Sequence, residues 1–180
     1  KDVRWKYGTP SPANANYAWL QHILWKLAPN GKAGVVLANG SLSSTNNNED
    51  EIRKEMIIDD VVEIILALPS QLFGRNFQGP VCVWFLTKDK TLKGNDRRGE
   101  ILFIDARKEG IMKERVRRIL TEKDISKISN TINSWRFSDE YEDQPGFCYK
   151  AKFEEIEQNK FVLNPGRYVG FPDDDDDDEP

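Results

Sequence analysis

The first stretch of periodic apolar positions predicts a helix over residues 17–28. Its apolar side chains recur at helical spacing on one face, which consists of Leu20, Ile23, Leu24 and Leu27. Pro29-Asn30-Gly31 follows and predicts a clean end to this helix. The continuous apolar run over residues 33–38 then predicts a strand covered on both faces, as in a parallel sheet.

A second helix is predicted after the polar loop that ends at Asn48. Asn48-Glu49-Asp50-Glu51 is typical of a capped helix start, with Asn48 as the cap and a glutamate at the third helical position. The acidic groups would face the positive end of the helix. The helix is expected to end near residues 59–60.

The next two strands are expected to pair antiparallel. Residues 61–68, interrupted by Glu63, and residues 80–87 form the two apolar runs. Only a dozen residues separate Leu68 from Val81, and they contain proline, two glycines and no helical periodicity. A parallel crossover normally needs a helix of its own, so the economical pairing is antiparallel. The chain therefore predicts an α/β sheet that finishes with an antiparallel strand.

The last third of the chain predicts mostly helical and extended segments. Residues 100–105 are expected to form a strand, and Thr121-Glu122-Lys123-Asp124 resembles a capping box with Asp in place of Glu or Gln. The helix that follows would present one apolar face, made of Ile125, Ile128, Ile132 and Trp135. Further on we expect a loop over 137–147, a short helix around 153–158 and an extended segment over 161–169.

Composition places the chain among globular proteins. Hydrophobic residues make up 38% and charged residues 31% of its 180 positions. The net charge is −4, but removing the seven acidic groups of residues 173–179 changes it to +3, so the folded part is mildly basic and the acidic run is expected to be a disordered tail. The longest apolar runs are far too short to span a bilayer. The start at Lys1 lacks Met and an apolar signal segment, which indicates a fragment or a processed chain.

Few residue types that carry chemistry are present in a recognisable pattern. Cys82 and Cys148 have no metal-type spacing, and Cys82 is expected to be a buried thiol in a cytoplasmic protein. His22 is the single histidine, so the sequence offers almost no candidate residues for a histidine metal site or a Ser-His-Asp triad. No glycine-rich phosphate or nucleotide loop and no nucleophile elbow occurs, which disfavours a kinase or an α/β hydrolase. Asn39-Gly40-Ser41 could hold a ligand edge, although an ordinary turn is the simpler interpretation.

The chain resembles the modification subunits of type I restriction–modification systems, which are N6-adenine DNA methyltransferases. The similarity runs in order from Asp2 to Gly170, and each piece is weak by itself. The segments that carry it are Asn14–Leu24, Leu27–Gly40, Glu51–Lys54, Ala67–Pro69 with Leu72-Phe73, Pro80–Leu86, Arg98–Arg107 and Leu163–Val169. The resemblance implies the C-terminal half of a Rossmann-like S-adenosylmethionine-dependent methyltransferase sheet.

The resemblance also implies a division of the chain into three parts. Residues 1–107 would be a partial methyltransferase domain, residues 108–170 its helical and extended C-terminal extension, and residues 171–180 the acidic tail. The cofactor loop and the catalytic Asn-Pro-Pro-Phe motif of the family would lie before Lys1, and Asn164-Pro165-Gly166 is no substitute for it. We therefore expect the chain alone to be inactive, although its parent would methylate adenine.

The partners that the resemblance implies are DNA, a specificity subunit that reads the target sequence, and a restriction subunit. S-adenosylmethionine would be the methyl donor of the parent enzyme. A different hypothesis is a naturally truncated, non-catalytic module that binds the specificity subunit or DNA. Loss of the first strands would expose a sheet edge, so self-association of the chain is also expected.

Three aromatic residues are carried over from the family as candidates for the site, and an arginine of the same loop is added to them. Trp19 falls where related enzymes place an aromatic ring beside the adenine of the cofactor, with a helix-core tryptophan as the equal alternative. Phe73 falls where they place an aromatic ring against the flipped base, and Phe77 is its alternative because this loop is about one residue longer than usual. Arg75 could meet a DNA phosphate, although a solvated surface arginine is the simpler interpretation. A wider basic patch, either facing DNA or simply solvated on a helix, would consist of Arg97, Arg98, Arg115, Arg117 and Arg118.

Overall fold

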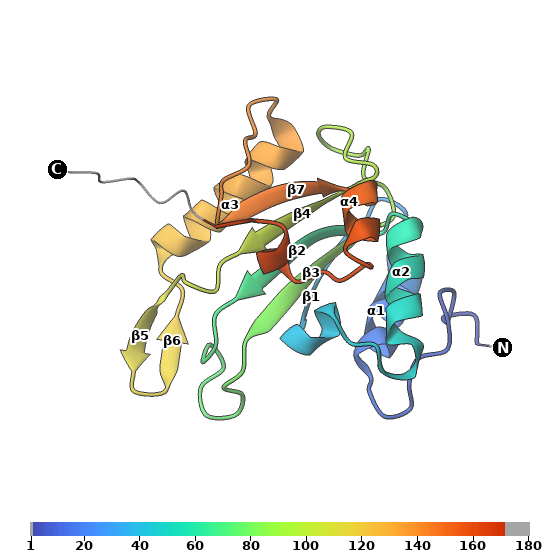
Figure 1. Ribbon diagram of the computed structural model, residues 1–180, viewed down its shortest axis with the longest axis horizontal. Helices are drawn as coiled ribbons and strands as arrows, with labels where there is room; N and C mark the ends of the chain where they lie inside the picture. The colour runs from blue at the N-terminus through green and yellow to red at the C-terminus, as the bar shows by residue number, and fades with distance from the viewer. Residues whose placement is uncertain (1, 172–180) are drawn as a thin grey trace.

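A five-stranded mixed sheet is the centre of the protein, in a computed structural model that describes residues 2–171 (Figure 1). Its strands are arranged in the order β1-β3-β2-β4-β7. Their bounds are β1 Lys32–Ala38, β2 Val62–Leu68, β3 Val81–Thr87, β4 Glu100–Asp105 and β7 Cys148–Lys152. β3 is antiparallel to both β1 and β2, β2 and β4 are parallel, and β7 is antiparallel to β4. The expected α/β architecture and the antiparallel β2–β3 pairing are confirmed.

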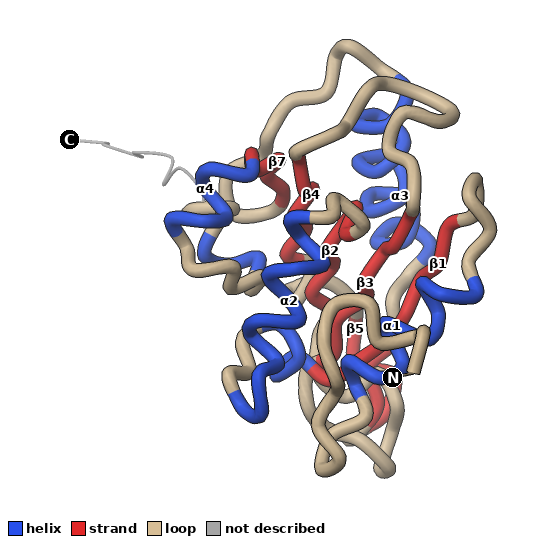
Figure 2. Tube along the Cα trace, turned by 90° about the vertical axis from the view of Figure 1, so that its right-hand side faces the viewer, coloured by secondary structure: helices blue, strands red, loops and turns tan. Residues whose placement is uncertain are grey.

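Helices cover both faces of this sheet. On one face α1 (Asn16–Lys26) and α2 (Glu49–Ile58) enclose a core that includes Tyr17, Leu20, Met56, Trp84 and Phe103. On the other face α3 (Glu122–Phe137) packs Ile128, Ile132 and Trp135 against Ile64, Leu102 and Ile104. Figure 2 shows α2 and α3 on opposite sides of the strands. This arrangement explains why β2 is buried along its whole length.

The remaining elements are short. A second sheet consists of the two antiparallel strands β5 (Ile111–Glu114) and β6 (Arg117–Ile119), which we call the β5–β6 hairpin. A short helix α4 (Phe153–Gln158) follows β7, as expected. The 3-10 turns are η1 Asn39–Leu42, η2 Asn46–Asn48 and η3 Pro165–Arg167. Residues 108–170 thus contribute the β5–β6 hairpin and the strand β7, and the sequence predicted neither of them.

The expectation for residues 33–38 is wrong in one respect, because β1 is not covered on both faces. It lies at the edge of the sheet and pairs only with β3, antiparallel, within the part of the chain that the structure describes. Its residues alternate between partly buried and exposed, and the side chain of Val36 is 51% exposed. An apolar run is consistent with either location, because hydrophobicity does not tell which elements lie on the two faces of a strand.

Helix starts agree with the expectations in one case and differ in another. Thr121 and Asp124 form the capping box of α3: the Asp124 amide donates to Thr121 Oγ1 at 3.2 Å, and the Thr121 amide donates to Asp124 Oδ2 at 2.7 Å. Asn48 does not cap α2 through its side chain, because its backbone is left-handed with φ 62°. The expected extended segment over 161–169 is also wrong, since it contains the turn η3. The acidic tail expected over 171–180 lies outside the described residues from position 172 onward.

Glu63 interrupts the apolar run of β2 because it sits at an irregularity of the strand. The register with β3 shifts between Val62 and Ile64, which places these two residues in opposite core layers and leaves Glu63 outside the regular alternation. The buried carboxylate faces three cations: Lys32 at 2.6 Å, Arg136 at 2.7 Å and Arg97 at 3.5 Å. Burial by itself raises the pKa of Glu63, but hydrogen bonds from Arg136 and Lys32 outweigh it and hold this pKa below its ordinary value.

Candidate functional site

Three parallel strands bring their carboxyl ends to one edge of the sheet. β1, β2 and β4 run in the same direction and end at Ala38, Leu68 and Asp105. In open α/β sheets the crevice outside the carboxyl ends of the strands is where ligands usually bind. We call this side of the molecule the carboxyl edge, and it is the candidate site.

A cavity of about 270 Å³ lies at the carboxyl edge. Its lining comes from the ends of all three strands and from the turn η3, and consists of Asn39, Ala67, Arg107, Asn164, Pro165, Gly166 and Arg167. The cavity therefore joins segments that are far apart in the sequence. A larger cavity of about 500 Å³ lies at the opposite edge, where Asp59 and Lys88 help to line it. It is remote from the strand ends that mark the candidate site.

The position of Arg107 in the smaller cavity is set by an ion pair and by a glycine. Its guanidinium group pairs with Asp105 at 2.6 Å, and the hydrogen bonds that it donates to this carboxylate raise the pKa of Arg107. A Cβ atom on Gly166 would lie 3.0 Å from Arg107 Nη2 and 3.7 Å from Asp105 Oδ2. Glycine at position 166 thus allows the turn to close over the ion pair.

Asn39, which helps to line this cavity, has an unused hydrogen-bond acceptor. Its side-chain oxygen Oδ1 is buried and has no hydrogen-bond partner among the described residues. A buried amide oxygen without a partner costs free energy, and a ligand with an N–H group would satisfy it. From the sequence, residues 39–41 are either a ligand edge or an ordinary turn. The structure has a 3-10 turn there and places Asn39 in the cavity lining.

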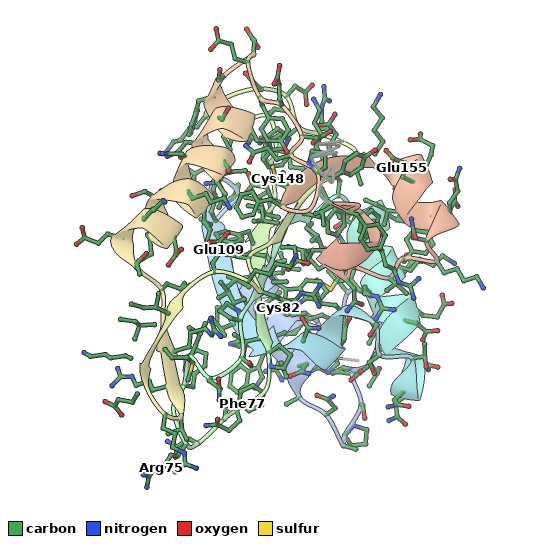
Figure 3. The ribbon with its side chains drawn as sticks, turned by 60° about the vertical axis from the view of Figure 1, so that its left-hand side comes forward. Arg75, Phe77, Cys82, Glu109, Cys148 and Glu155 are labelled. Atoms are coloured by element: carbon green, nitrogen blue, oxygen red, sulfur yellow. The ribbon has the colours of Figure 1, made fainter. Side chains whose placement is uncertain are left out.

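The loop between β2 and β3, residues 69–80, also lies at the carboxyl edge. Phe73 is 53% and Phe77 40% exposed, so neither ring belongs to the core. The Phe77 ring lies against Gly79, whose added Cβ would be 3.0 Å from it. Figure 3 shows Arg75 at the outer tip of this loop and Phe77 closer to the body of the protein. Both phenylalanines are accessible to a ligand, and they stay alternative candidates for the base contact.

Trp19 lies on the outer face of α1. Its side chain is 59% exposed and forms an edge-on contact with His22, with the ring centroids 6.4 Å apart. A shallow groove of about 380 Å³ passes beside it, with Arg4 and Trp5 on the other wall. The alternative interpretation, a helix-core tryptophan, is wrong because the ring is on the surface. The position of Trp19 beside the cofactor stays a prediction.

The five arginines of the expected basic patch do not lie together. Arg97 is 1% exposed and faces Glu63 inside the protein, and Arg98 forms an ion pair with Asp96 at 2.6 Å. Both precede β4, at the edge opposite to the candidate site. The other three, Arg115, Arg117 and Arg118, belong to the β5–β6 hairpin. A single patch of all five, whether facing DNA or solvated on a helix, is therefore wrong, because tertiary structure separates the set and places three of its members on a β-hairpin.

Other residues of chemical interest have structural roles. Cys82 is fully buried, as expected, and burial raises the pKa of its thiol, which makes it a poor nucleophile. Ser41 accepts a hydrogen bond from Trp84 Nε1 at 3.1 Å, so its hydroxyl is used inside the core. Among residues 2–171 no group of three or more His, Cys, Asp or Glu side chains could hold a metal ion. No helix in that range is long and apolar enough to cross a membrane.

Known proteins are similar to this chain over nearly all of its length. The profile of the family described as N-6 DNA Methylase matches residues 1–177. The methylase subunit of the type I restriction enzyme HindI from Haemophilus influenzae is 55% identical over 99% of the chain, and that of MjaIX from Methanocaldococcus jannaschii is 42% identical over 95%. These stretches represent 39% and 30% of the two relatives. The chain therefore spans well under half the length of these curated relatives.

Solved structures agree with this similarity. The crystal structure of the type I restriction–modification methyltransferase subunit from Streptococcus thermophilus superposes with a TM-score of 0.79 at 32% identity, covering 94% of this chain and 34% of that one. The M protein of the type I restriction enzyme EcoKI superposes with a TM-score of 0.68 at 16% identity, over 94% of this chain and 40% of that one. The second match supports the fold alone.

Proposed function

This chain belongs to the N-6 DNA methylase family, and on that premise we propose that it is the C-terminal part of the methylase domain of a type I modification subunit. The parent protein would transfer a methyl group from S-adenosylmethionine to the exocyclic nitrogen of adenine in DNA. The observation that carries the proposal is the 55% identity to a type I methylase subunit over 99% of this chain. Its partners would be DNA, the specificity subunit and the restriction subunit, in the cytoplasm.

The free edge of β1 is the place where the rest of the methylase domain would join. An edge strand presents unpaired backbone N–H and C=O groups that pair readily with another strand. β1 has only β3 as a partner among the described residues, and Val36 on it is half exposed. We propose that a strand from the upstream part of the parent pairs with β1 and brings the catalytic motif beside Asn39. The same edge would let isolated copies of the chain associate.

Residues of this chain suit one part of S-adenosylmethionine, its adenine ring. The groove beside Trp19 has aromatic and cationic walls, which suit the adenine ring of S-adenosylmethionine. No glycine-rich loop for the remainder of the cofactor occurs in the sequence. The bound cofactor would supply an electrophilic methyl group. This chain would contribute at most one wall of its site.

The chain's own share of catalysis would be to receive and orient the target base. An adenine that leaves the duplex must exchange its stacking partners for an aromatic surface, and Phe73 or Phe77 would provide one, worth ~1–3 kcal/mol. The buried Oδ1 of Asn39 could accept a hydrogen bond from the base or from the sugar–phosphate next to it. Arg75 at the loop tip would contact a phosphate. These roles are positioning roles, and they depend on a catalytic motif from elsewhere in the parent.

Methyl transfer by the parent protein tests the proposal directly. The intact subunit, with its specificity partner, is incubated with DNA and S-adenosylmethionine that carries a radiolabelled methyl group. We expect label in N6-methyladenine of the DNA, and no label when the 180-residue chain is used alone. Absence of label in adenine with the intact subunit and partner would contradict the proposed function.

A further inference from the structure

The β5–β6 hairpin lies directly beside the β2–β3 loop that carries Phe73 and Phe77. Figure 1 shows the hairpin and the loop next to one another, projecting from the body at the carboxyl edge. The backbone amide of Arg118 on β6 donates to the carbonyl of Gln71 in the loop at 3.0 Å, which joins the two segments. The hairpin is thus held next to the place where the target base would enter.

The hairpin is held in shape by its own residues. The guanidinium of Arg118 donates to the carbonyls of Glu109 at 3.3 Å and Gly110 at 3.0 Å, at the base of the hairpin. Gly110 has φ +84°, and a Cβ on it would lie 2.7 Å from the carbonyl oxygen of Ile119. Position 110 therefore requires glycine, and Arg118 is used for structure instead of for a partner.

The other cations of this surface are exposed and have no acidic partner. Among residues 2–171, ten Lys and Arg side chains form ion pairs with carboxylates. Arg107 and Lys127, near the base of the hairpin, are two of them and pair with Asp105 and Glu109. The exposed cations of the hairpin, of its base and of the β2–β3 loop form none of these ion pairs. The exposed cations there are Arg75, Lys108, Lys113, Arg115 and Arg117. Glu114 is the one carboxylate on the two strands of the hairpin, so the surface carries a clear positive charge within a chain whose net charge is −4.

Apolar side chains accompany these cations. Ile111 is 56% and Met112 43% exposed, both on β5. A two-stranded antiparallel ribbon fits a DNA groove, and exposed Ile and Met side chains on such a ribbon can contact sugars and base edges while cations bind the phosphates. Charge, shape and position of the hairpin all complement duplex DNA.

We propose that the β5–β6 hairpin is a DNA-binding arm that contacts the duplex beside the extruded adenine. Arg115 and Arg117 bind backbone phosphates, Lys113 and Arg75 extend the contact on either side, and the ribbon lies along the groove. This inference rests on the proposed function and names the surface by which the chain holds its substrate. It assigns most of the phosphate contacts to the β5–β6 hairpin, which is a separate sheet from the five-stranded one.

Charge reversal on the hairpin tests the proposal, with a matched control at the opposite edge. The test variant of the full 180-residue chain is Arg115→Glu with Arg117→Glu. The control variant is Lys26→Glu with Lys93→Glu, which changes the charge by the same amount at exposed residues that form no ion pair with a described carboxylate. Binding of a fluorescein-labelled 30-base-pair duplex is followed by fluorescence anisotropy between about 50 and 200 mM salt. Circular dichroism verifies that each variant is folded.

We expect the hairpin variant to bind the duplex roughly tenfold or more weakly at low salt, and the slope of log K against log salt to fall by about 2, because each lost phosphate contact removes about 0.9 from it. The control variant keeps a slope close to that of the unchanged chain. Equal losses in both variants, an unchanged slope in the hairpin variant, or absence of duplex binding by the unchanged chain would overturn the proposal. The proposal would also be overturned if the hairpin variant kept its DNA affinity but lost binding to the specificity subunit, because the hairpin would then be a protein interface. None of these results bears on methyl transfer by the parent, so the two proposals fail separately.

Discussion

Replacing the buried carboxylate Glu63 with glutamine is expected to destabilise the protein strongly. The carboxylate is 0% exposed and lies within 3.5 Å of Arg97, which is 1% exposed and cannot reach water. Lys32 and Arg136 are 32% and 15% exposed, so both can regain some hydration when their partner is lost. The free-energy cost therefore comes mainly from Arg97, which would be left as a buried charge without a carboxylate partner, held only by hydrogen bonds to backbone carbonyls and by the Trp135 ring. Removal of one member of such a pair costs about 3–5 kcal/mol.

Urea unfolding followed by tryptophan fluorescence measures this cost. With a denaturant slope of about 2 kcal/mol/M, the midpoint of Glu63→Gln should fall by about 1.5–2.5 M. Glu51→Gln is the matched control, because Glu51 pairs with Lys54 at 3.7 Å on the surface, where its side chain is 63% exposed. That variant should shift the midpoint by less than about 0.3 M. A shift for Glu63→Gln as small as that of the control would refute the reasoning.

The same cluster predicts a dependence of stability on pH. Since the pKa of Glu63 is held below its ordinary value in the folded protein, the carboxylate contributes stability above its unfolded pKa of 4.5 and loses that contribution as the pH falls through the lower folded pKa. The difference in free energy of unfolding between the unchanged chain and Glu63→Gln should be constant above about pH 5. It should shrink in more acidic solution. A difference that grows on acidification would contradict the assigned ion pairs.

Three further predictions concern the carboxyl edge and the capping box. Phe73→Ala and Phe77→Ala in the parent test which ring stacks on the extruded base. The variant that removes the stacking ring should bind a duplex with an extruded base analogue ~1–3 kcal/mol more weakly, measured by fluorescence anisotropy. If neither variant loses affinity, this loop does not belong to the base pocket. Gly166→Ala should displace Arg107 and slow methyl transfer by the parent about tenfold, with an almost unchanged unfolding midpoint, whereas full activity would remove the cavity from the site. Thr121→Ala should lower the Tm by about 2–4 °C in a thermal melt, and an unaltered Tm would mean that the capping box contributes nothing.

Local features of the fold were predictable from the sequence because they depend on neighbouring residues. The helix α1 follows from apolar spacing and its end from Pro29 to Gly31, and the capping box at Thr121 depends on a residue three positions later. The antiparallel pairing of β2 and β3 follows from the length of the loop between them. Family membership could also be inferred, because ordered similarity along a chain survives when each single segment is weak.

The candidate site was only partly predictable. The family resemblance predicts the phenylalanines at positions 73 and 77, and the arginine at position 75 is a candidate phosphate contact on the same loop at the carboxyl edge. The cavity at the same edge could not be predicted, because it combines Asn39 with Gly166, more than a hundred positions away in the sequence. No local pattern indicates such a pairing.

The tertiary structure alone decided which chemically similar residues are available for function. Arg97 and Arg117 are the same residue type in equally polar surroundings of the sequence, yet Arg97 is buried against Glu63 and Arg117 is exposed on the β5–β6 hairpin. It also decided that β1 lies at an edge and that β7 extends the sheet. The physical reason is the same in each case. Burial and charge pairing depend on what other segments bring to the same place, whereas helix periodicity, capping and turn length depend on residues that are close in the chain.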